Sequence, residues 1–412
     1  MIMDCAKYAG KCICGREHTL ETLKVVVEYN ALEHFEDHMQ ELGLTGKRTV
    51  VYDQMTYKLT EGQRPKADQE IILDPKGLRA EDVIIEKMME ELDNPEVIVA
   101  VGAGTIMDFG RYPAYKLGIP FVAIPTLASS DGFTANICSA IINGQKKSSA
   151  MCAPTLVVAD LNIIKGAPKF LVASGINDIL SKYISVLDWK FSKIVANEYF
   201  CPVVCSLAEH ALELMRGAAD KYAVTGEADH EAMTMAQMES GLTMQLLDHS
   251  RAASGSEHLM AHLVEMSPPG LEEAEGIHGE CVGVGTFATI KEYKRLASMT
   301  PKAKEFEPLS EDWVREKFGD RLTAGIMKEN ENDVLKTFPG QNIVDHWDEI
   351  KAMIDALPSV EEMEALYKGC GAKYLPEHIG IPAEIADDVL DMSSAIRNRL
   401  TLNRAKRLLS FE

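Results

Sequence analysis

Two histidines, His258 and His262, lie four residues apart in SGSEHLMAHLVEM, which spans residues 254–266. Apolar side chains at Leu259, Leu263 and Met266 repeat at helical spacing, so we expect a helix with both imidazoles near its apolar face. Imidazole is a common metal ligand, whereas a histidine on an apolar face is more often a packed core residue. The pair therefore leaves two interpretations open, metal binding and core packing.

Two residues elsewhere in the chain favour metal binding. Asp178 lies in ASGINDILSKYISVLDW, near the expected start of the first helix of the second half of the chain. His278 lies in EGIHGECVGVG, 20 residues after His258. One carboxylate and two imidazoles form a mixed oxygen and nitrogen donor set, which leaves the open coordination positions that a catalytic divalent ion requires.

A glycine turn in EVIVAVGAGTIMDFGR joins an apolar run to an expected helix. Gly102 and Gly104 would let backbone N–H groups approach a ligand, and the following helix N-terminus would favour a pyrophosphate. The pattern differs from Gly-x-Gly-x-x-Gly, so glycines required only by the turn are the alternative. Upstream, Asp53 ends RTVVYD. Its carboxylate either accepts hydrogen bonds from a ribose, which favours NAD over NADP, or starts a turn.

Small polar residues gather in IPTLASSDGFTAN, after another apolar run. Thr126, Ser129, Ser130 and Asp131 offer hydroxyl and carboxylate groups that suit recognition of phosphate, ribose or substrate hydroxyls. An ordinary polar loop is the alternative interpretation.

The order of apolar patterns predicts an α/β class followed by an all-α part. Short β-branched runs alternate with helical patterns up to about Pro168, which indicates a parallel sheet covered on both faces. Beyond Lys169 long helical patterns dominate, with a solvated loop at residues 301–308. We expect an N-terminal arm over residues 1–20, a Rossmann-like dinucleotide-binding domain over 21–168 and a helical metal- and substrate-binding domain over 169–412, with the active site in the cleft between the last two.

Composition excludes several classes of partner. The 412 residues carry 42 basic and 63 acidic side chains, a net charge of −21, which repels nucleic acid and anionic membranes. No apolar run approaches the ~20 residues of a membrane-spanning helix, and the N-terminus lacks the apolar core of a signal peptide. Nine scattered cysteines suit a reducing compartment. We therefore expect a cytoplasmic enzyme without membrane insertion.

The N-terminal segment carries a second group of metal-ligating residues. Cys12 and Cys14, with Cys5 and His18 nearby, could bind a metal, but the spacing matches no common zinc module. We therefore expect a locally exposed arm in preference to a metal site.

Five motifs in one order carry a family resemblance. GAGTIMD, PTLASSDGFT, SGINDILSKYISVLDW, LDHSRAASGSEH and HGE extend over residues from about 20 to 290. Together they resemble the bacterial branch of the sn-glycerol-1-phosphate dehydrogenases, in the superfamily of glycerol dehydrogenase, iron-type alcohol dehydrogenases and dehydroquinate synthase. The resemblance implies hydride transfer between NAD(P)(H) and the dihydroxyacetone phosphate and glycerol 1-phosphate pair. A polyol dehydrogenase and a dehydroquinate-synthase-like lyase are the alternatives.

The resemblance also implies roles for single residues. Asp178, His258 and His278 would ligate Ni²⁺ or Zn²⁺, with catalysis assigned to Asp131, His262 and Asp178. We favour His262 as the group that relays the substrate proton. The residues expected at the NAD(P) cofactor are Asp53, Met55, Gly102, Gly104, Thr105, Ile106, Met107, Asp108, Thr126, Leu127, Ala128, Ser129 and Ala135.

The chain departs from the family pattern at three positions near the expected cofactor site. Met55 replaces an amide side chain near the cofactor, Ala135 replaces a common serine, and Ala103 stands where glycine or serine is frequent. These departures concern the choice of cofactor and not the reaction. The substrate phosphate has candidates in Arg251, Ser254 and Ser256, although Arg251 could equally cap a helix. Relatives tend to associate, so we expect a homodimer.

Overall fold

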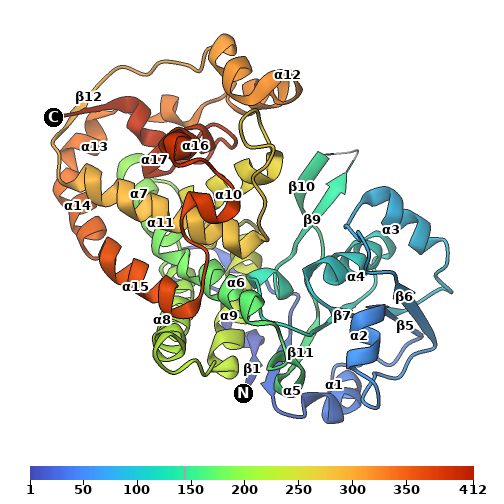
Figure 1. The fold of residues 1–412 in the computed structure, drawn as a ribbon. Coiled ribbons are helices and arrows are strands. Elements are labelled where there is room, and N and C mark those ends of the chain that lie inside the picture. The colour runs from blue at the N-terminus through green and yellow to red at the C-terminus, as the bar shows by residue number, and fades with distance from the viewer. Residues whose placement is uncertain (143–144) are drawn as a thin grey trace. The chain divides into compact units, whose positions relative to one another are not determined.

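The computed structural model describes residues 1–142 and 145–412 of the chain (Figure 1). These residues form two compact units. The first consists of Met1–Gly175, Glu213–Lys221 and Glu227–Ser250, and the second of Ile176–Leu212, Tyr222–Gly226 and Arg251–Glu412. Each unit has its own core.

A seven-stranded sheet forms the centre of the first unit, in the order β1-β4-β11-β8-β7-β5-β6. Six of its strands lie in the region up to Pro168 where the sequence predicts short β-branched runs, and each of the six pairs in parallel with its neighbours among them. They are β4 (Lys24–Glu28), β5 (Arg48–Asp53), β6 (Gln69–Leu73), β7 (Val97–Gly102), β8 (Phe121–Pro125) and β11 (Leu156–Asp160). The predicted parallel sheet is confirmed.

Apolar residues on both faces explain why helices cover this sheet. Along β7, Val99 and Val101 join a core cluster with Phe35, which opens helix α1 (Phe35–Glu41). Ala100 points to the opposite face, where α4 (Gly104–Leu117) packs on β7 and comes so close at Gly110 that a Cβ there would lie 2.8 Å from that of Ala100. The remaining helices of this region are α2 (Gln54–Leu59), α3 (Asp82–Met89) and α5 (Leu161–Ile164).

Residues 1–20 belong to the first unit, which corrects the expectation of a separate exposed arm. The strand β1 (Ile2–Asp4) pairs antiparallel with β4 and adds an edge strand to the sheet. A hairpin follows, formed by β2 (Gly10–Lys11) and β3 (Glu17–His18). With only Met3 buried in β1, the segment is too short to show a period-two pattern in the sequence.

Helix α9 (His230–Leu247) also belongs to the first unit, although the sequence placed residues 169–412 in one helical domain. It packs against the short helix η3 (Asp131–Phe133). A Cβ at Gly241 of α9 would collide with the Thr134 hydroxyl and the Asp131 carbonyl, so only glycine allows this approach. A helical pattern in the sequence does not specify which core the helix joins.

The second unit is built mainly of helices. Two short strands, β12 (Pro301–Ala303) and β13 (Leu409–Phe411), pair antiparallel, so the all-helical prediction and the predicted loop at 301–308 are wrong at these residues. The C-terminal segment contains two separate helices, α16 (Ala386–Ser393) and α17 (Leu402–Ala405). Helices α6 (Lys169–Leu180) and α8 (Pro202–Thr225) each contribute residues to both units. The other helices of the second unit are α7 (Lys182–Ala196), α10 (Ser256–Met266), α11 (His278–Ala297), α12 (Glu311–Glu329), α13 (Gln341–Asp345), α14 (Trp347–Asp355) and α15 (Val360–Cys370).

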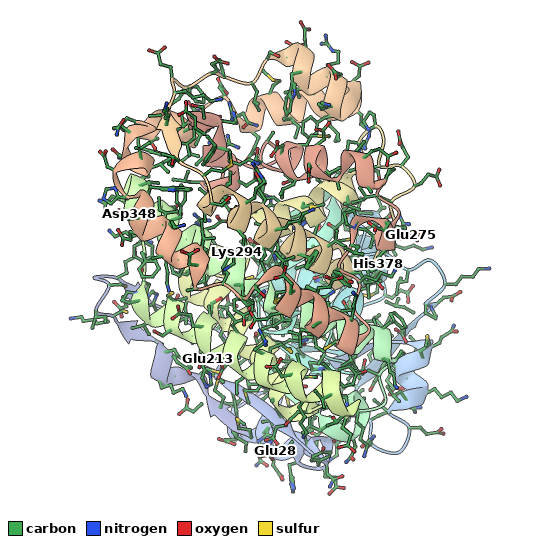
Figure 2. The ribbon with its side chains drawn as sticks, turned by 60° about the vertical axis from the view of Figure 1, so that its left-hand side comes forward. Glu28, Glu213, Glu275, Lys294, Asp348 and His378 are labelled. Carbon is green, nitrogen blue, oxygen red and sulfur yellow. The ribbon has the colours of Figure 1, made fainter. Side chains whose placement is uncertain are left out.

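Charged side chains of these units are either exposed to solvent or hydrogen-bonded to the backbone of another segment (Figure 2). Glu213, Glu275 and Asp348 are exposed, in keeping with the acidic net charge. Lys294 of α11 instead donates hydrogen bonds to the carbonyls of Asp355 and Leu357, at 3.2 and 2.8 Å. It thereby fixes α11 to the segment that ends α14.

One helical stretch of the described residues, Lys169–Ala196, is long and apolar enough to cross a membrane by composition. Within it, 78% of the most apolar window is buried inside the protein, and the charged side chains of Asp178, Lys182 and Asp188 are buried there too. Such burial is typical of core helices. The apolar residues of α6 and α7 therefore pack in the protein core.

Candidate metal and cofactor sites

The predicted helix at residues 254–266 is confirmed as α10. His258 lies in its first turn and His262 one turn later, with ring centroids 6.2 Å apart. His258 is buried, whereas the His262 side chain is 22% exposed. The two imidazoles therefore share one side of the helix but have different access to solvent.

Three side chains from three helices converge in the second unit. Asp178 lies near the C-terminal end of α6, which corrects its expected place near a helix start, and His278 is the first residue of α11. The Nε2 atoms of His258 and His278 lie 3.5 and 3.8 Å from Asp178 Oδ1. One ligand atom from each of the three residues lies within 4.8 Å of the others. Ligand atoms about 2.0–2.2 Å from one ion have mutual separations of this size.

The second ring nitrogen of each histidine is bonded to a carboxylate that the sequence analysis missed. His258 Nδ1 lies 2.8 Å from Glu257 Oε1, and His278 Nδ1 lies 3.4 Å from Glu265 Oε1. Because a carboxylate only accepts, each Nδ1 carries a hydrogen that it donates to its glutamate, and each Nε2 is left on the side of Asp178. Carboxylates fix metal-binding histidines in this way in many metalloproteins, and Glu265, three residues after His262, could have been found by its helical spacing.

The electrostatics of this group favour a cation. Burial by itself lowers the pKa of His258, but hydrogen bonds with Asp178 and Glu257 outweigh it and raise that pKa to about 9. Burial by itself raises the pKa of Asp178, yet Lys182 and the two imidazoles hold it below its usual range. Three carboxylates therefore contact two imidazoles in a buried region, and this donor set fits a divalent metal ion.

Two glycines of α11 allow the three helices to meet. A Cβ at Gly285 would collide with the backbone carbonyl of Glu257 on α10. A Cβ at Gly283 would collide with the side-chain amide of Asn177, which precedes Asp178 on α6. The spacing of the ligands therefore depends on backbone approach at positions that carry no side chain.

We expect Gly285→Ala to destabilise the protein and to weaken metal binding, because the added methyl group pushes α10 away from α11. Overpacking of this kind costs about 1–3 kcal/mol, and displaced ligands reduce metal affinity by roughly 10- to 100-fold. Urea unfolding and metal titration measure the two effects.

Gly325→Ala on α12 is the matched control, since a Cβ there meets nothing within 4 Å. It should raise stability by up to about 1 kcal/mol through helix propensity and leave metal affinity unchanged. Equal behaviour of the two variants would show that α10 and α11 do not need this close contact.

His262 lies beside the three candidate ligands but is bonded differently. Its Nδ1 lies 3.2 Å from Glu265 Oε2, so one glutamate holds both His262 and His278. Burial is the main cause that lowers the pKa of His262 to about 4, and the charge of Arg397 adds to it, while the hydrogen bond and charge of Glu265 offset part of the shift. The imidazole is therefore neutral at pH 7 and can accept a proton.

The predicted cofactor residues of the first unit begin at one edge of the sheet. Strands β5, β7 and β8 are parallel neighbours, so Asp53, Gly102 and Pro125 end them side by side. The Thr126 N–H donates to the Gly102 carbonyl at 3.1 Å and joins the two turns. Phosphates and dinucleotides bind at such carboxyl edges of parallel sheets.

The helix that follows the glycine turn presents its N-terminus to this edge. No side chain caps α4, and a Cβ at Gly104 would meet nothing within 4 Å, so a ligand has room beside the first backbone N–H groups. At Gly102 a Cβ would lie 2.7 Å from Ile106 Cβ. Gly104 is therefore placed for ligand approach, and Gly102 is required by packing.

Several predicted cofactor residues are engaged within the protein. Asp53 Oδ1 caps α2 by accepting from the Thr56 N–H at 2.7 Å, which leaves its second oxygen for a ligand. The side chains of Ile106 and Met107 are buried, and Asp108 is ion-paired with Arg111 at 3.2 Å. These three can face a cofactor only through their backbone.

The remaining predicted residues also belong to the first unit. Met55 is 70% exposed on α2, whereas Ala135 is buried. The Ala128 carbonyl accepts from Gln237 Nε2 at 2.7 Å, and Asp131 Oδ2 accepts from the Ser240 hydroxyl at 2.8 Å. Helix α9 therefore holds the loop that carries Thr126, Leu127, Ala128, Ser129 and Asp131.

Two of the residues that the sequence proposed as phosphate ligands, Arg251 and Ser256, use their side chains in hydrogen bonds within the protein. Arg251 is buried, and its Nε donates to Glu198 Oε1 at 2.9 Å. The Ser256 hydroxyl bonds to Asp188 Oδ2 at 2.9 Å and to the Tyr293 hydroxyl at 2.8 Å. These contacts give Arg251 and Ser256 structural roles.

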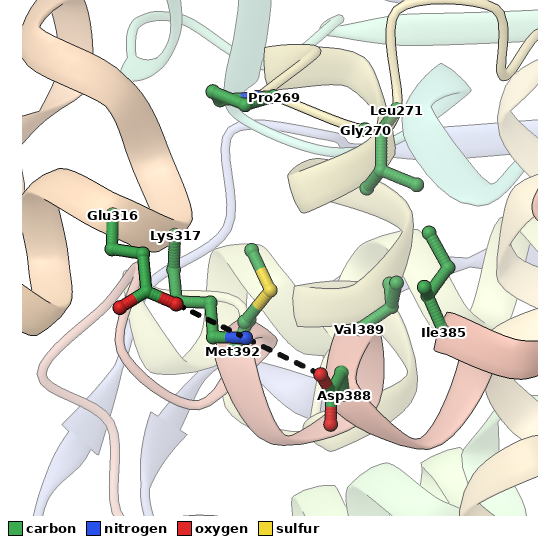
Figure 3. Close-up of a pocket in the computed structure, with 9 residues that line it drawn as sticks. All are labelled: Pro269, Gly270, Leu271, Glu316, Lys317, Ile385, Asp388, Val389 and Met392. Carbon is green, nitrogen blue, oxygen red and sulfur yellow. Dashed lines mark hydrogen bonds and ion pairs between the residues drawn. The ribbon is translucent and has the colours of Figure 1, made fainter.

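A pocket of about 200 Å³ lies elsewhere in the second unit (Figure 3). The Lys317 ammonium and the Asp388 carboxylate are 3.3 Å apart at its rim. It is lined by Pro269, Gly270, Leu271, Glu316, Lys317, Ile385, Asp388, Val389 and Met392. Because none of these nine residues belongs to the predicted site, the pocket gives no support to the proposed chemistry.

Comparison with known proteins identifies relatives over most of the chain. The family model for iron-containing alcohol dehydrogenases matches residues 26–168. The NAD(P)+ glycerol-1-phosphate dehydrogenase of Geobacillus stearothermophilus is 32% identical over 340 residues, 82% of this chain and 77% of the relative. That of Halalkalibacterium halodurans is 29% identical over 98% of this chain and 96% of the relative.

Solved structures support the same fold. Glycerol dehydrogenase from Schizosaccharomyces pombe superposes with a TM-score of 0.56 at 18% identity and covers 87% of this chain and 93% of its own. A 1,3-propanediol oxidoreductase gives a TM-score of 0.60 at 17% identity over 94% and 96%. At these identities the likeness concerns the fold alone. Together with the curated relatives, it shows that the chain belongs to the glycerol-1-phosphate dehydrogenase family, within the iron-containing alcohol dehydrogenase fold.

Proposed function

We propose that this protein is a metal- and NAD(P)-dependent oxidoreductase that interconverts dihydroxyacetone phosphate and sn-glycerol 1-phosphate. The observation that carries the proposal is the convergence of Asp178, His258 and His278, with each Nδ1 held by a glutamate. The relatives are named for this activity, which supports the substrate. Scattered cysteines support a cytoplasmic location, where we expect a homodimer.

Asp178, His258 and His278 would hold one divalent ion, nickel or zinc, because carboxylate and imidazole suit both. When bound, such an ion supplies Lewis-acid stabilisation of negative charge on the substrate oxygen. Glu257 and Glu265 keep the two imidazoles in the tautomer that offers Nε2. The role of this chain is therefore to position the three donors before substrate arrives.

Oxidation of the alcohol releases a hydride from its central carbon and a proton from its oxygen. When bound, NAD(P)+ would supply the acceptor for this hydride. We assign the proton to His262, because its neutral imidazole has solvent access and is oriented by Glu265. Asp131, held by Ser240, remains our candidate for a substrate contact in the first unit. The N-terminus of α4 and the carboxylate of Asp53 would bind the pyrophosphate and ribose of the cofactor.

A cluster of arginines in the second unit supports a phosphorylated substrate over glycerol. Burial together with the charges of Arg251 and Arg397 lowers the pKa of Arg399 to about 9, against a partial offset from Glu257 and Glu198. Arg397 also lies within electrostatic reach of His262. Guanidinium groups crowded together favour a bound anion. We therefore propose Arg397, in place of Arg251, as the group that recognises the phosphate.

The test is NAD(P)H formation, followed by absorbance, with sn-glycerol 1-phosphate, glycerol 3-phosphate and glycerol. We expect turnover of the first at a kcat/KM at least ~10²-fold above the other two, since unpaired donors in a polar site reject a substrate that lacks their partner. Preference for glycerol would contradict the phosphate assignment. A lyase of the dehydroquinate synthase kind would form no net NAD(P)H with any of them.

The variant Arg397→Gln sharpens this test. Loss of one charged hydrogen bond, about 1.5–3 kcal/mol, should lower kcat/KM for glycerol 1-phosphate by roughly 10- to 100-fold and leave the weak turnover of glycerol nearly unchanged. Arg315→Gln is the control, because Arg315 is exposed on α12 and ion-paired with Glu311 at 2.6 Å. Equal losses for both substrates would remove Arg397 from phosphate binding.

A further inference from the structure

The N-terminal hairpin brings together three residues of the segment CICGREH, residues 12–18. Its strands pair Gly10 with His18 and Lys11 with Glu17. The turn is closed by the Gly15 N–H, which donates to the Cys12 carbonyl at 3.0 Å. Gly15 has a φ of +87°, which favours glycine at this position. The chain reversal therefore returns His18 to the side of the two cysteines.

The donor atoms of Cys12, Cys14 and His18 form a compact group. They lie within 4.8 Å of one another, and Cys14 Sγ is 3.4 Å from His18 Nε2. Zinc holds thiolate sulfur at about 2.3 Å and imidazole nitrogen at about 2.0–2.1 Å, so tetrahedral ligands are separated by distances of this order. The hairpin thus matches a zinc site in donor type and spacing.

His18 is oriented for this role by helix α9. The side chain is buried, and its Nδ1 lies 2.7 Å from the carbonyl oxygen of Leu246. Because a carbonyl only accepts, Nδ1 carries the hydrogen and the Nε2 lone pair faces Cys14. Leu246 lies in the last turn of α9, where carbonyls lack partners within the helix. The backbone therefore fixes the tautomer that a metal requires.

We propose that Cys12, Cys14 and His18 bind a structural Zn²⁺, distinct from the ion at Asp178, His258 and His278. Soft thiolates with one imidazole select zinc over the hard divalent ions. Because protein-bound zinc is four-coordinate, one position remains for a water molecule or another donor. Cys5, grouped with these residues in the sequence, is excluded, since burial raises its pKa to about 12 and its thiol donates to the Met3 carbonyl.

The ion would fasten the hairpin to the helix that supports the cofactor loop. Gln245, in the same last turn as Leu246, accepts from the N–H groups of Glu21 and Thr22 at 3.1 and 3.3 Å. Earlier in α9, Gln237 and Ser240 bond to the loop at Ala128 and Asp131. Zinc at the hairpin is therefore expected to order residues 10–20 and the end of α9.

Zinc content of the full-length protein tests the proposal. The protein is loaded with zinc and the unbound metal is then removed. We expect two zinc ions per chain in the wild type, one in His258→Ala, and none in His258→Ala combined with Cys14→Ser. Cobalt substitution gives a second readout, because thiolate-to-cobalt charge-transfer bands arise only where cysteine is a ligand. They should persist in His258→Ala and disappear in Cys14→Ser.

Cys152→Ser is the matched control, as Cys152 is half-buried in the same unit and its thiol donates to the Arg111 carbonyl. It should keep both zinc ions and the charge-transfer bands. Hydrogen exchange of residues 10–20 should be faster in Cys14→Ser than in Cys152→Ser if the ion is structural. A His258→Ala protein without zinc, or thiolate bands that survive Cys14→Ser, would overturn the proposal.

Discussion

His258→Ala is expected to abolish binding of the ion in the second unit and to lower kcat/KM for glycerol 1-phosphate by at least ~10³-fold. The variant removes one of three donors and leaves Glu257 and Asp178 as buried carboxylates that have lost their imidazole partner. A metal with only Asp178 and His278 as protein donors is held weakly. Metal content and NAD(P)H formation report the two losses.

The control for this variant is His346→Ala. His346 is exposed, and its Nδ1 bonds to the Asn342 carbonyl at 2.9 Å. Its removal should change neither metal content nor rate. Cys12, Cys14 and His18 are proposed to hold a second ion. The metal content of the catalytic centre is therefore the metal that remains bound in the Cys14→Ser variant. Full activity of His258→Ala would contradict the assignment of the three ligands.

His262→Ala is expected to retain the catalytic ion and to lower kcat by roughly 10²- to 10⁴-fold, the usual contribution of a positioned acid or base. His262 is not one of the three clustered ligands, and its Nδ1 is bonded to Glu265. KM for glycerol 1-phosphate should change little, because the phosphate contact is assigned to Arg397. The split between kcat and KM therefore separates proton transfer from substrate binding.

Metal content again provides the comparison for His262→Ala. A loss equal to that in His258→Ala would mean that the roles of the two histidines are exchanged or shared. The conservative variant His262→Gln keeps a group that can bond to Glu265 but cannot take up a proton near pH 7. If His262→Gln restored the rate, His262 would be a positioning residue that acts through Glu265.

The sequence predicts the sheet and the ligand types because both leave local signals. Six continuous apolar runs specify strands buried on two faces, and these strands are all present. The spacing of His258 and His262 specifies one side of α10. Asp178 and His278 were assigned through the family resemblance and their residue types, since nothing local shows that α6 and α11 meet.

The missed features depend on contacts between distant segments. Glu257 and Glu265 look like ordinary polar residues of a helix until the structure places them on the Nδ1 atoms of His258 and His278. Gly285 has no sequence pattern that identifies its neighbour. Helix α9 reads as one more helix of the C-terminal half, yet Gly241 and Ser240 join it to the first unit. Arg251 has a guanidinium group that suits phosphate, but this group is hydrogen-bonded to Glu198.

The most direct test of the account is an anomalous difference map from crystals of the metal-loaded protein, recorded at the absorption edge of nickel or zinc. We predict a peak about 2.0–2.2 Å from a carboxylate oxygen of Asp178 and from Nε2 of both His258 and His278, with each Nδ1 still bonded to its glutamate. Absence of a peak at these three residues, or coordination through His262 in place of His258 or His278, would contradict the account.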